Sequence, residues 1–284
     1  MLDIRLLREK PDFVRERLAT RDAGLSAQVD RVLVIDAQRR HAETELQKLN
    51  AERNRLSKEI GLLRSNKQPS AELEGRVRAI AEEISHQNAE VAAADEQQRD
   101  LLLNLPNLPH PQAPIGKNAA DNPLVREWGE KPSFTFAPRD HVELATTLKL
   151  IDFDRATKIS GSGFVCFTNL GARLQRGLLQ FLLDLHTTEH GYIEVSPPYL
   201  VRREAMIGTT QLPKFEHEMC YGLEEDQLFL IPTAEVPVTN LHREEILTLA
   251  ELPKKYVAYT PCFRREAGAA GKDTRGLIRI HQFD

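Results

Sequence analysis

The sequence predicts an α+β protein in which a long antiparallel two-helix coiled coil precedes a domain built on antiparallel strands. Two observations lead to this prediction. Apolar residues repeat at heptad spacing over two stretches that a short polar turn separates, and beyond a proline-rich segment the pattern changes to short strands and helices. We therefore expect a helical domain at 1–105, with its coiled coil at about 27–105, a linker at 106–132 and a second domain at 133–284.

The composition is that of an ordinary globular protein. Of the 284 residues, 41% are hydrophobic and the net charge is −4, so a basic surface for nucleic acid would have to be local. Cys166, Cys220 and Cys262 are far apart, which argues for a reducing compartment and against a disulfide framework. No apolar run approaches the roughly 18 residues of a membrane span. We expect a cytoplasmic protein that does not enter a membrane.

Residues 1–25 are expected to form a short strand or cap followed by a helix. Pro11 suits the first turn of that helix, and Phe13, Val14 and Leu18 share one face of it. The pattern indicates an element that packs against its neighbours and carries no site.

The two heptad seams predict a pair of long helices. The first seam contains Val32, Ile35, Ala42, Leu46, Leu49, Leu56, Ile60 and Leu63, and the second contains Leu73, Val77, Ile80, Ile84, Val91, Ala94, Leu101 and Leu105. The polar turn at 65–70 is so short that the helices must pack antiparallel. A helix of roughly 35 residues is about 50 Å long, so the pair is expected to project as an arm.

Charge is distributed unevenly along this arm. Residues 39–78 contain ten Lys or Arg against six Asp or Glu, a balance of +4, whereas 82–100 is mostly acidic. A projecting coiled coil is commonly a dimerisation rod. A basic tip half also fits contact between a rigid arm and an RNA backbone, and both alternatives stay open on these residues.

The second domain begins with helices and continues with strands. We expect helices at 141–151, 154–158 and 170–190, followed by strands at 192–195 and 228–231. The long helix ends at Gly191 and has one apolar face, which consists of Leu174, Leu178, Phe181, Leu182 and Leu185. Thr233, Ala234 and Glu235 come shortly after the strand at 228–231, and alone they indicate only a strand-to-helix cap.

The last predicted elements are strands at 256–263 and 277–283, which would form a hairpin with a long basic loop. Side chains two apart share a face of an extended chain, so Arg264 and Glu266 should point together while Arg265 points away. A second row on the partner strand consists of Arg279, His281 and Phe283.

These residue types suit a nucleotide, because Arg binds phosphate bidentately, Glu accepts from an exocyclic amine and Phe stacks on a base. A solvated hairpin with cross-strand charge pairs is the alternative. A phosphate-binding loop is excluded, since the pattern around Gly268 would need Gly at Glu266 and Ser or Thr at Asp273. His217 and Cys220 supply only two ligands, too few for a zinc site, so no metal ligands are predicted.

The segment from Phe263 to Asp284 also carries a family resemblance. Its residues Phe263-Arg264-x-Glu266, Gly268, Asp273 to Arg279 and His281 to Asp284 resemble the second signature motif of class II aminoacyl-tRNA synthetases, in the form found in bacterial-type seryl-tRNA synthetases. The run covers more than twenty residues, so the resemblance is specific.

Other segments are similar to the same family. The helix at 170–190, the strand after it and Pro198 resemble the first motif of the family. Three further segments match the family elsewhere: Asn107 to His110, Arg126 to Gly129 and the loop 208–215. The third residue of that loop is usually Gly in the family and is Thr210 here. The resemblance implies that 133–284 is part of a class II synthetase catalytic domain with an antiparallel sheet.

The resemblance implies a serine–tRNA ligase, which activates serine with ATP to seryl-adenylate and transfers it to tRNA(Ser). It implies a homodimer formed through the first motif, and an N-terminal arm that holds the long variable arm of the tRNA by its shape and phosphates. ATP and Mg²⁺ are the implied cofactors. No side-chain base is needed because the carboxylate of serine is the nucleophile, so catalysis depends on positioning and on charge neutralisation at phosphorus.

The resemblance also implies roles for individual residues. Arg264 is the implied catalytic residue, which neutralises the pentavalent phosphorus together with Mg²⁺. Implied ATP contacts are Arg264, Arg265, Glu266 on the adenine amine, Arg279 on the phosphates and Phe283 on the ring. Serine binding is implied for Thr233, Ala234 and Glu235.

The sequence ends at Asp284 inside the second motif, without the third motif of the family. We therefore expect a fragment of the enzyme that is inactive by itself. Three function classes remain: a ligase present in part, a non-catalytic synthetase-like module that binds tRNA, and a structural coiled-coil protein. The presence of both the Thr-Ala-Glu and the Phe-Arg-x-Glu sets favours the ligase.

Overall fold

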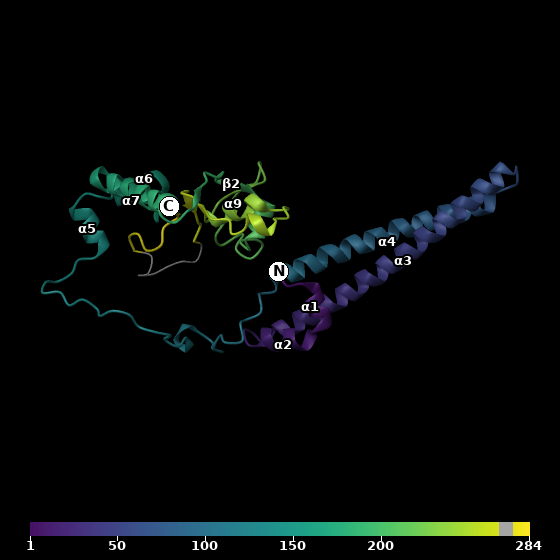
Figure 1. Ribbon diagram of the computed structural model, residues 1–284, viewed down its shortest axis with the longest axis horizontal. Coiled ribbons are helices and arrows are strands. Elements are labelled where there is room, and N and C mark those ends of the chain that lie inside the picture. The colour runs from purple at the N-terminus through teal and green to yellow at the C-terminus, as the bar shows by residue number, and fades with distance from the viewer. Residues whose placement is uncertain (267–274) are drawn as a thin grey trace. The chain divides into compact units, whose positions relative to one another are not determined.

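The computed structural model describes residues 1–266 and 275–284. The chain divides into two compact units, Met1–Gly129 and Glu130–Asp284, and each is described by itself (Figure 1). None of the described helices combines the length and the apolar composition needed to span a bilayer.

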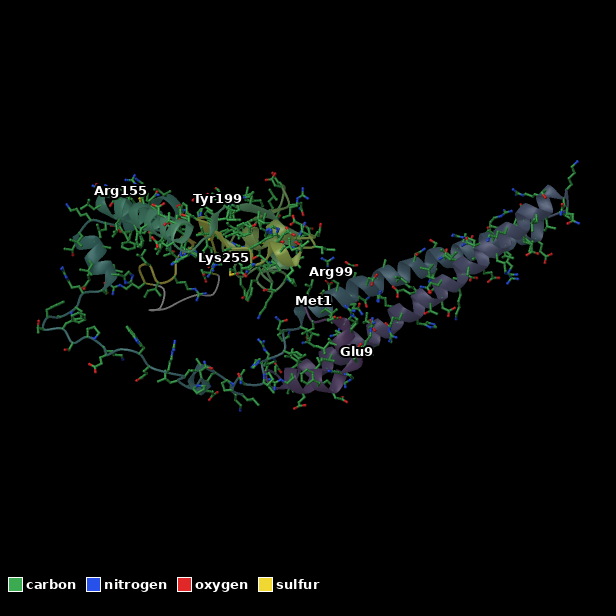
Figure 2. All side chains as sticks on the ribbon, viewed as in Figure 1. Met1, Glu9, Arg99, Arg155, Tyr199 and Lys255 are labelled. Atoms are coloured by element: carbon green, nitrogen blue, oxygen red, sulfur yellow. The ribbon has the colours of Figure 1, made fainter. Side chains whose placement is uncertain are left out.

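Two long helices form the arm of the first unit: α3, Leu25–Ser65, and α4, Ala71–Asn104. They run antiparallel, side by side, with side chains projecting outward along both (Figures 1 and 2). Leu56, Ile80 and Ile84 are buried between them. The predicted coiled coil is therefore confirmed, because heptad positions from both seams bury one another.

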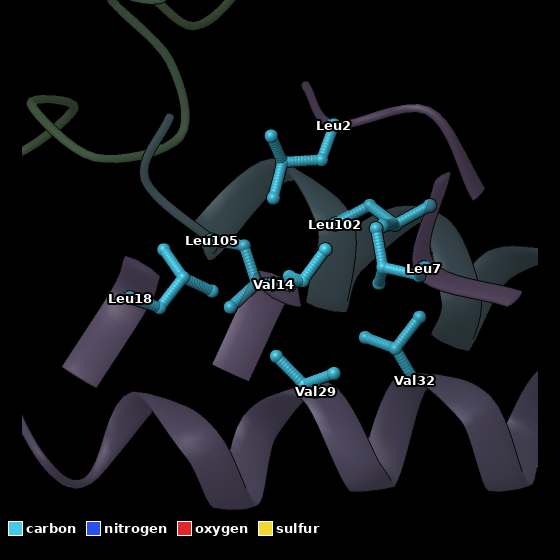
Figure 3. Close-up of a cluster of buried hydrophobic side chains, with 8 residues drawn as sticks. All are labelled: Leu2, Leu7, Val14, Leu18, Val29, Val32, Leu102 and Leu105. Carbon is cyan, nitrogen blue, oxygen red and sulfur yellow. The ribbon is translucent and has the colours of Figure 1, made fainter. Parts of the chain in front are cut away.

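Two short helices close the open end of the arm: α1, Ile4–Glu9, and α2, Pro11–Ala19. Of the two expected alternatives, a short strand or a cap, the structure has the cap: Asp3 accepts the backbone N–H of Arg5 at 2.8 Å. A buried cluster joins these helices to both arm helices (Figure 3). Its members are Leu2, Leu7, Val14, Leu18, Val29, Val32, Leu102 and Leu105.

A buried carboxylate lies next to this cluster. Asp36 on α3 is 0% exposed and accepts hydrogen bonds from Arg8 Nε at 2.7 Å, Arg40 Nε at 3.0 Å and Gln98 Nε2 at 2.8 Å. Burial by itself would raise the pKa of Asp36, but the hydrogen bonds from Arg8, Gln98 and Arg40 outweigh it and lower the pKa to about 2. The charged network ties α1, α3 and α4 together.

The segment after α4 is mostly irregular, as its prolines predict. Arg17 on α2 donates to the carbonyl of Pro109 at 2.8 Å, which holds the start of this segment against the end of the arm. The helical turn described beyond it is η1, Ala119–Asp121. The first unit ends shortly afterwards, at Gly129.

The second unit contains five α-helices within the described residues, and short strands between them. The helices are α5, His141–Thr147; α6, Phe153–Ser160; α7, Asn169–Thr188; α8, Arg203–Gly208; and α9, Glu235–Thr239. The strands are β1, Ile193–Glu194; β2, Leu200–Arg202; β3, Tyr221–Leu223; β4, Leu228–Leu230; β5, Tyr256–Val257; β6, Cys262–Phe263; and β7, Gln282–Phe283. Two 3-10 turns, η2 at Asn240–His242 and η3 at Leu249–Glu251, follow α9.

The described strands form three small sheets. β2, β4 and β3 make an antiparallel sheet in that order, and β6 pairs antiparallel with β7. β1 pairs parallel with β5, which the prediction of antiparallel strands did not include. The core beside the three-stranded sheet consists of Val201, Met206, Leu212, Cys220, Ile231 and Val236.

The predicted hairpin is present but much shorter than expected. Cys262 pairs with Phe283 and Phe263 with Gln282, so the register joins the predicted strands. The stretch 256–263 is not one strand, because Pro261 has no N–H to donate to a ladder and separates β5 from β6. Residues 275–280 form a turn instead of a strand.

The apolar stripe of α7 remains open within this unit. Leu170, Leu174, Leu178 and Phe181 are 55 to 66% exposed and follow one another at helical spacing. Gly191, at which the sequence predicts the helix to stop, has φ of +68°. Glycine adopts this conformation without strain. The exposed stripe is a surface that this unit by itself does not cover.

Candidate active site

Arg264 is fixed at the end of β6 by three contacts. Its backbone N–H donates to the carbonyl of His281 at 2.9 Å, and its Nε donates to the carbonyl of Pro232 at 3.1 Å. Its Cζ lies 4.8 Å from the ring centroid of Phe283. The guanidinium is thus oriented by the turn before α9 and by the aromatic ring of β7.

A pocket of about 570 Å³ lies in front of this arginine. Its lining consists of Arg264, Glu266, Leu277, Ile278, Arg279, Ile280 and Phe283. The volume falls within the range of small-molecule sites, and two arginines beside apolar walls suit a ligand with an anionic part and a planar part.

Glu266 and Arg279 form an ion pair at the edge of this pocket. Arg279 Nε donates to Glu266 Oε2 at 2.6 Å, and the Glu266 side chain is only 12% exposed. Glu266 has φ of +48°, which is uncommon for a residue other than glycine. The pair holds one positive and one negative group at a defined separation.

Arg265 points to the opposite side, as the alternation predicts. Its Cζ lies 6.0 Å from the ring centroid of Tyr221, and its backbone N–H donates to the carbonyl of Met219 at 2.9 Å. It lines a separate pocket of about 240 Å³ with the ion pair of Arg203 and Glu216. The structure therefore does not bring Arg265 together with the other four residues of the expected ATP set.

His281 does not share a face with Arg279 and Phe283, and this expectation was wrong. Its ring packs 5.3 Å from that of Phe164, and its Nδ1 lies 3.0 Å from the carbonyl oxygen of Arg264. The turn at 275–280 breaks the alternation that the prediction assumed, so His281 supports the backbone of Arg264 from behind.

A second pocket, of about 370 Å³, adjoins the first. Thr233 and Ala234 line it together with Tyr259 and Asp284, and Phe283 lines both pockets. Glu235 is exposed at the start of α9, where its backbone N–H donates to Thr233 Oγ1 at 3.4 Å. Two of the three expected serine residues, Thr233 and Ala234, thus lie beside the expected ATP residues, with Phe283 between them, whereas Glu235 does not line this pocket.

Sequence reasoning gave no role to Asp284, which the structure places in this second pocket. Its carboxylate is held by Gln175 of α7. Burial, and then the Asp284 carboxylate, raise the pKa of the Tyr259 hydroxyl. A fixed carboxylate at the second pocket provides an acceptor for a cationic group. The only signal in the sequence that could have indicated Asp284 is its position at the end of the family motif.

Two further predictions concern the loop between α8 and β3. Thr210, which stands where the family usually has Gly, adopts φ of +64°, the left-handed region that favours glycine. Cys220 is buried, and burial raises the pKa of its thiol to about 11, so it stays protonated at neutral pH. Within 1–266 and 275–284, no group of three or more His, Cys, Asp or Glu side chains is arranged for a metal ion.

Comparison with known sequences identifies the family. The family described as the seryl-tRNA synthetase N-terminal domain matches residues 1–109, and the tRNA synthetase class II core domain (G, H, P, S and T) matches 215–284. A serine–tRNA ligase of Methylacidiphilum infernorum is 47% identical over 287 residues, which cover the whole chain and 67% of that protein. The chain belongs to the seryl-tRNA synthetase family.

Other family members agree with this assignment. Serine–tRNA ligases of Akkermansia muciniphila and Trichlorobacter lovleyi are 51% and 48% identical over the whole chain, which spans 66% of each. Seryl-tRNA synthetase from Pyrococcus horikoshii, solved in complex with ATP, matches the whole chain with a TM-score of 0.86 and 38% identity, and 68% of its own chain is covered. The chain thus spans about two thirds of the length of these relatives, and the resemblance seen in the sequence is confirmed.

Proposed function

We propose that this chain contributes to a serine–tRNA ligase. In the first step a carboxylate oxygen of serine attacks the α-phosphorus of ATP, which forms seryl-adenylate and releases pyrophosphate. In the second step a ribose hydroxyl at the 3′ end of the tRNA attacks the seryl carbonyl and AMP leaves. The observation that carries the proposal is the adjacency of the two pockets, joined at Phe283, in a member of the seryl-tRNA synthetase family.

Arg264 is the proposed catalytic residue. Its guanidinium is oriented by Pro232 and Phe283 before any ligand binds, so stabilising negative charge at phosphorus requires little reorganisation. Arg279 is proposed to contact the phosphates, Glu266 the adenine amine and Phe283 the adenine ring. Arg265, which faces away, would reach ATP only after its side chain leaves Tyr221.

Thr233, Ala234 and Glu235 are proposed to bind the amino group of serine. Thr233 and Ala234 line the second pocket, and the Asp284 carboxylate in the same pocket adds a negative charge that suits an ammonium group. A serine bound there would have its carboxylate directed toward Phe283 and Arg264, which is the direction required for attack on phosphorus.

Mg²⁺ is proposed to enter bound to ATP. The described residues of the site offer one carboxylate on the first pocket, Glu266, and Arg279 engages it. This donor set fits a cation held mainly by phosphate oxygens and water, as Mg²⁺ is in many ATP sites. Bound there, the metal would supply charge neutralisation at the phosphates.

The arm is proposed to bind tRNA(Ser). Its tip half has a balance of +4, and a rigid pair of helices can follow the shape of a double-stranded RNA segment. We also propose a homodimer, in which a second copy covers the exposed stripe Leu170, Leu174, Leu178 and Phe181 of α7.

The decisive experiment joins this chain to the last third of the Akkermansia muciniphila relative and measures serine-dependent pyrophosphate exchange. We expect exchange with serine and little with threonine. The 284 residues alone should exchange far more slowly, since apolar side chains that share a pocket with Asp284, such as Leu182 and Tyr259, are exposed at 41% and 40%. A folded chimera that binds tRNA but shows no exchange would instead indicate a non-catalytic tRNA-binding module.

A further inference from the structure

The wall of the first pocket is held from a distant part of the chain. The backbone N–H of Leu277 donates to Nε2 of His141, the first residue of α5, at 3.0 Å. Because Nε2 accepts this bond, the imidazole is neutral and carries its proton on Nδ1. This pairing joins residues 136 positions apart in the sequence.

The two residues before Leu277 are held at the same place. Arg275 Nη1 lies 3.0 Å from Asp140 Oδ2, and Asp140 also caps α5 by accepting the N–H of Glu143 at 2.8 Å. Gly276 has φ of +69°, and a Cβ added there would lie 2.2 Å from His141 Nε2. Only glycine allows the backbone to approach the imidazole this closely.

Leu277 is the first residue of the pocket wall that this contact fixes. Leu277, Ile278, Arg279 and Ile280 line the pocket in succession, and Arg279 pairs with Glu266. Since Arg279 is two residues from Leu277, a shift of the Leu277 amide moves the guanidinium that is proposed to contact phosphate.

We propose that His141 is a positioning residue for the nucleotide pocket. It acts by accepting the Leu277 N–H, which sets the place of the wall and of Arg279. This inference rests on the proposed function, because the ligand is taken to be ATP. His141 itself does not line the pocket; its role is to keep the pocket in the shape that binds ATP before ATP arrives.

The test uses calorimetry to compare the ATP affinity of the unaltered 284-residue chain with that of four variants. We expect His141→Ala to weaken ATP binding about fivefold to tenfold, the size of one lost hydrogen bond. His141→Gln can place an amide oxygen near the position of Nε2, so it should retain affinity within about threefold. Glu143→Ala is the matched control: it perturbs the cap of α5 but does not contact 275–277, and should change affinity less than about twofold.

Two structural measurements accompany the affinities. Amide exchange of Leu277 should accelerate in His141→Ala and not in Glu143→Ala, and nitrogen NMR of the unaltered chain should show His141 protonated at Nδ1. Gly276→Ala adds a Cβ that would clash with the His141 ring and so disturb the same contact, and it should also weaken ATP binding. It replaces His141→Ala in the test if that variant does not fold.

The outcomes separate the two proposals. If the unaltered chain does not bind ATP, the proposed nucleotide site of this chain fails. If it binds ATP and His141→Ala, His141→Gln and Gly276→Ala all bind equally well, the nucleotide site stands and the positioning role of His141 is overturned. An Nε2-protonated His141 would also overturn it.

Discussion

The guanidinium of Arg264 lies over the ring of Phe283, with Cζ 4.8 Å from the ring centroid. In the proposed reaction these two side chains contact different parts of ATP, the α-phosphate and the adenine. Their mutual contact, together with the hydrogen bond from Arg264 Nε to the carbonyl of Pro232, keeps the guanidinium in a fixed orientation. Preorganisation of this kind is what makes a charge effective in a transition state.

Replacing Arg264 therefore has a defined expected effect. In the chimera, Arg264→Ala should lower serine-dependent pyrophosphate exchange about 10²- to 10³-fold, or roughly 3–4 kcal/mol, as for other lost preorganised donors. Arg264→Lys should restore little, since an ammonium lacks the planar fork. Arg265→Ala is the matched control and should cost far less, because Arg265 lines a different pocket. Equal damage from both alanine variants, with both folded, would contradict the site.

The arm makes a prediction about salt and charge. Among the ion pairs described between 39 and 78, none involves Arg55 or Lys58, so both are available to phosphate. The chain should bind a tRNA with a long variable arm more tightly than one without it. Arg55→Glu with Lys58→Glu should weaken that binding and reduce the slope of log K against log salt by about 2.

The control for the arm is Arg99→Glu, which lies in the acidic half and should leave binding nearly unchanged. Filter binding over a series of salt concentrations measures all of these affinities. Equal affinity for the two kinds of tRNA would contradict selective recognition by the arm.

Asp36 predicts how stability depends on pH. Its pKa is about 2 in the folded arm, below its ordinary value near 4 in an unfolded chain, so the carboxylate stabilises the fold above pH 4. This stability, about 2 kcal/mol, should be lost as the pH falls from about 4 to about 2. Asp36→Asn should lower the free energy of unfolding at pH 7 by at least that amount.

Denaturant unfolding followed by helical circular dichroism at pH 7 and pH 3 measures this effect. Asp30→Asn is the control, since Asp30 pairs with Arg15 but is 57% exposed, and it should cost under about 0.5 kcal/mol. If Asp36→Asn and Asp30→Asn unfold alike at pH 7, the buried network does not stabilise the arm.

Thr210 predicts a stabilising substitution. Its φ of +64° is unfavourable for a β-branched residue by roughly 1–2 kcal/mol, and glycine removes that cost at the expense of some unfolded-state entropy. Thr210→Gly should therefore stabilise the second unit by about 0.5–1 kcal/mol. Thr209→Gly should destabilise it, because Thr209 is buried and its hydroxyl donates to Ala205. Thermal unfolding of both variants decides the matter.

The arm could be predicted from the sequence because heptad spacing directly encodes burial. Leu56, Ile60, Ile80 and Ile84 all occupy predicted seam positions and are buried. Asp36 and Gln98 are buried too, and they were missed because a pattern of apolar residues treats every polar residue as solvent-facing. Their burial depends on partners from α1 that no local spacing reveals.

The site was predictable where the chain is extended and not where it turns. Alternation placed Arg264 and Arg265 on opposite sides correctly. It failed for His281, because the turn at 275–280 interrupts the strand that the alternation assumed. The partnership of His141 with Leu277 was beyond prediction, since nothing local in either segment indicates a contact between them.

The buried cluster at the base of the arm has a consequence for synthesis of the chain. Leu7 is packed with Leu102, so the ribosome must add about a hundred residues after Leu7 before the two can meet. At roughly 5–20 residues per second, the N-terminal helices wait roughly 5–20 seconds for their final partners. During that interval α3 can already form, because its hydrogen bonds are local, but the cluster around Leu7 still lacks Leu102 and Leu105. The nascent chain is therefore most exposed to aggregation or to capture by a chaperone just before α4 is complete.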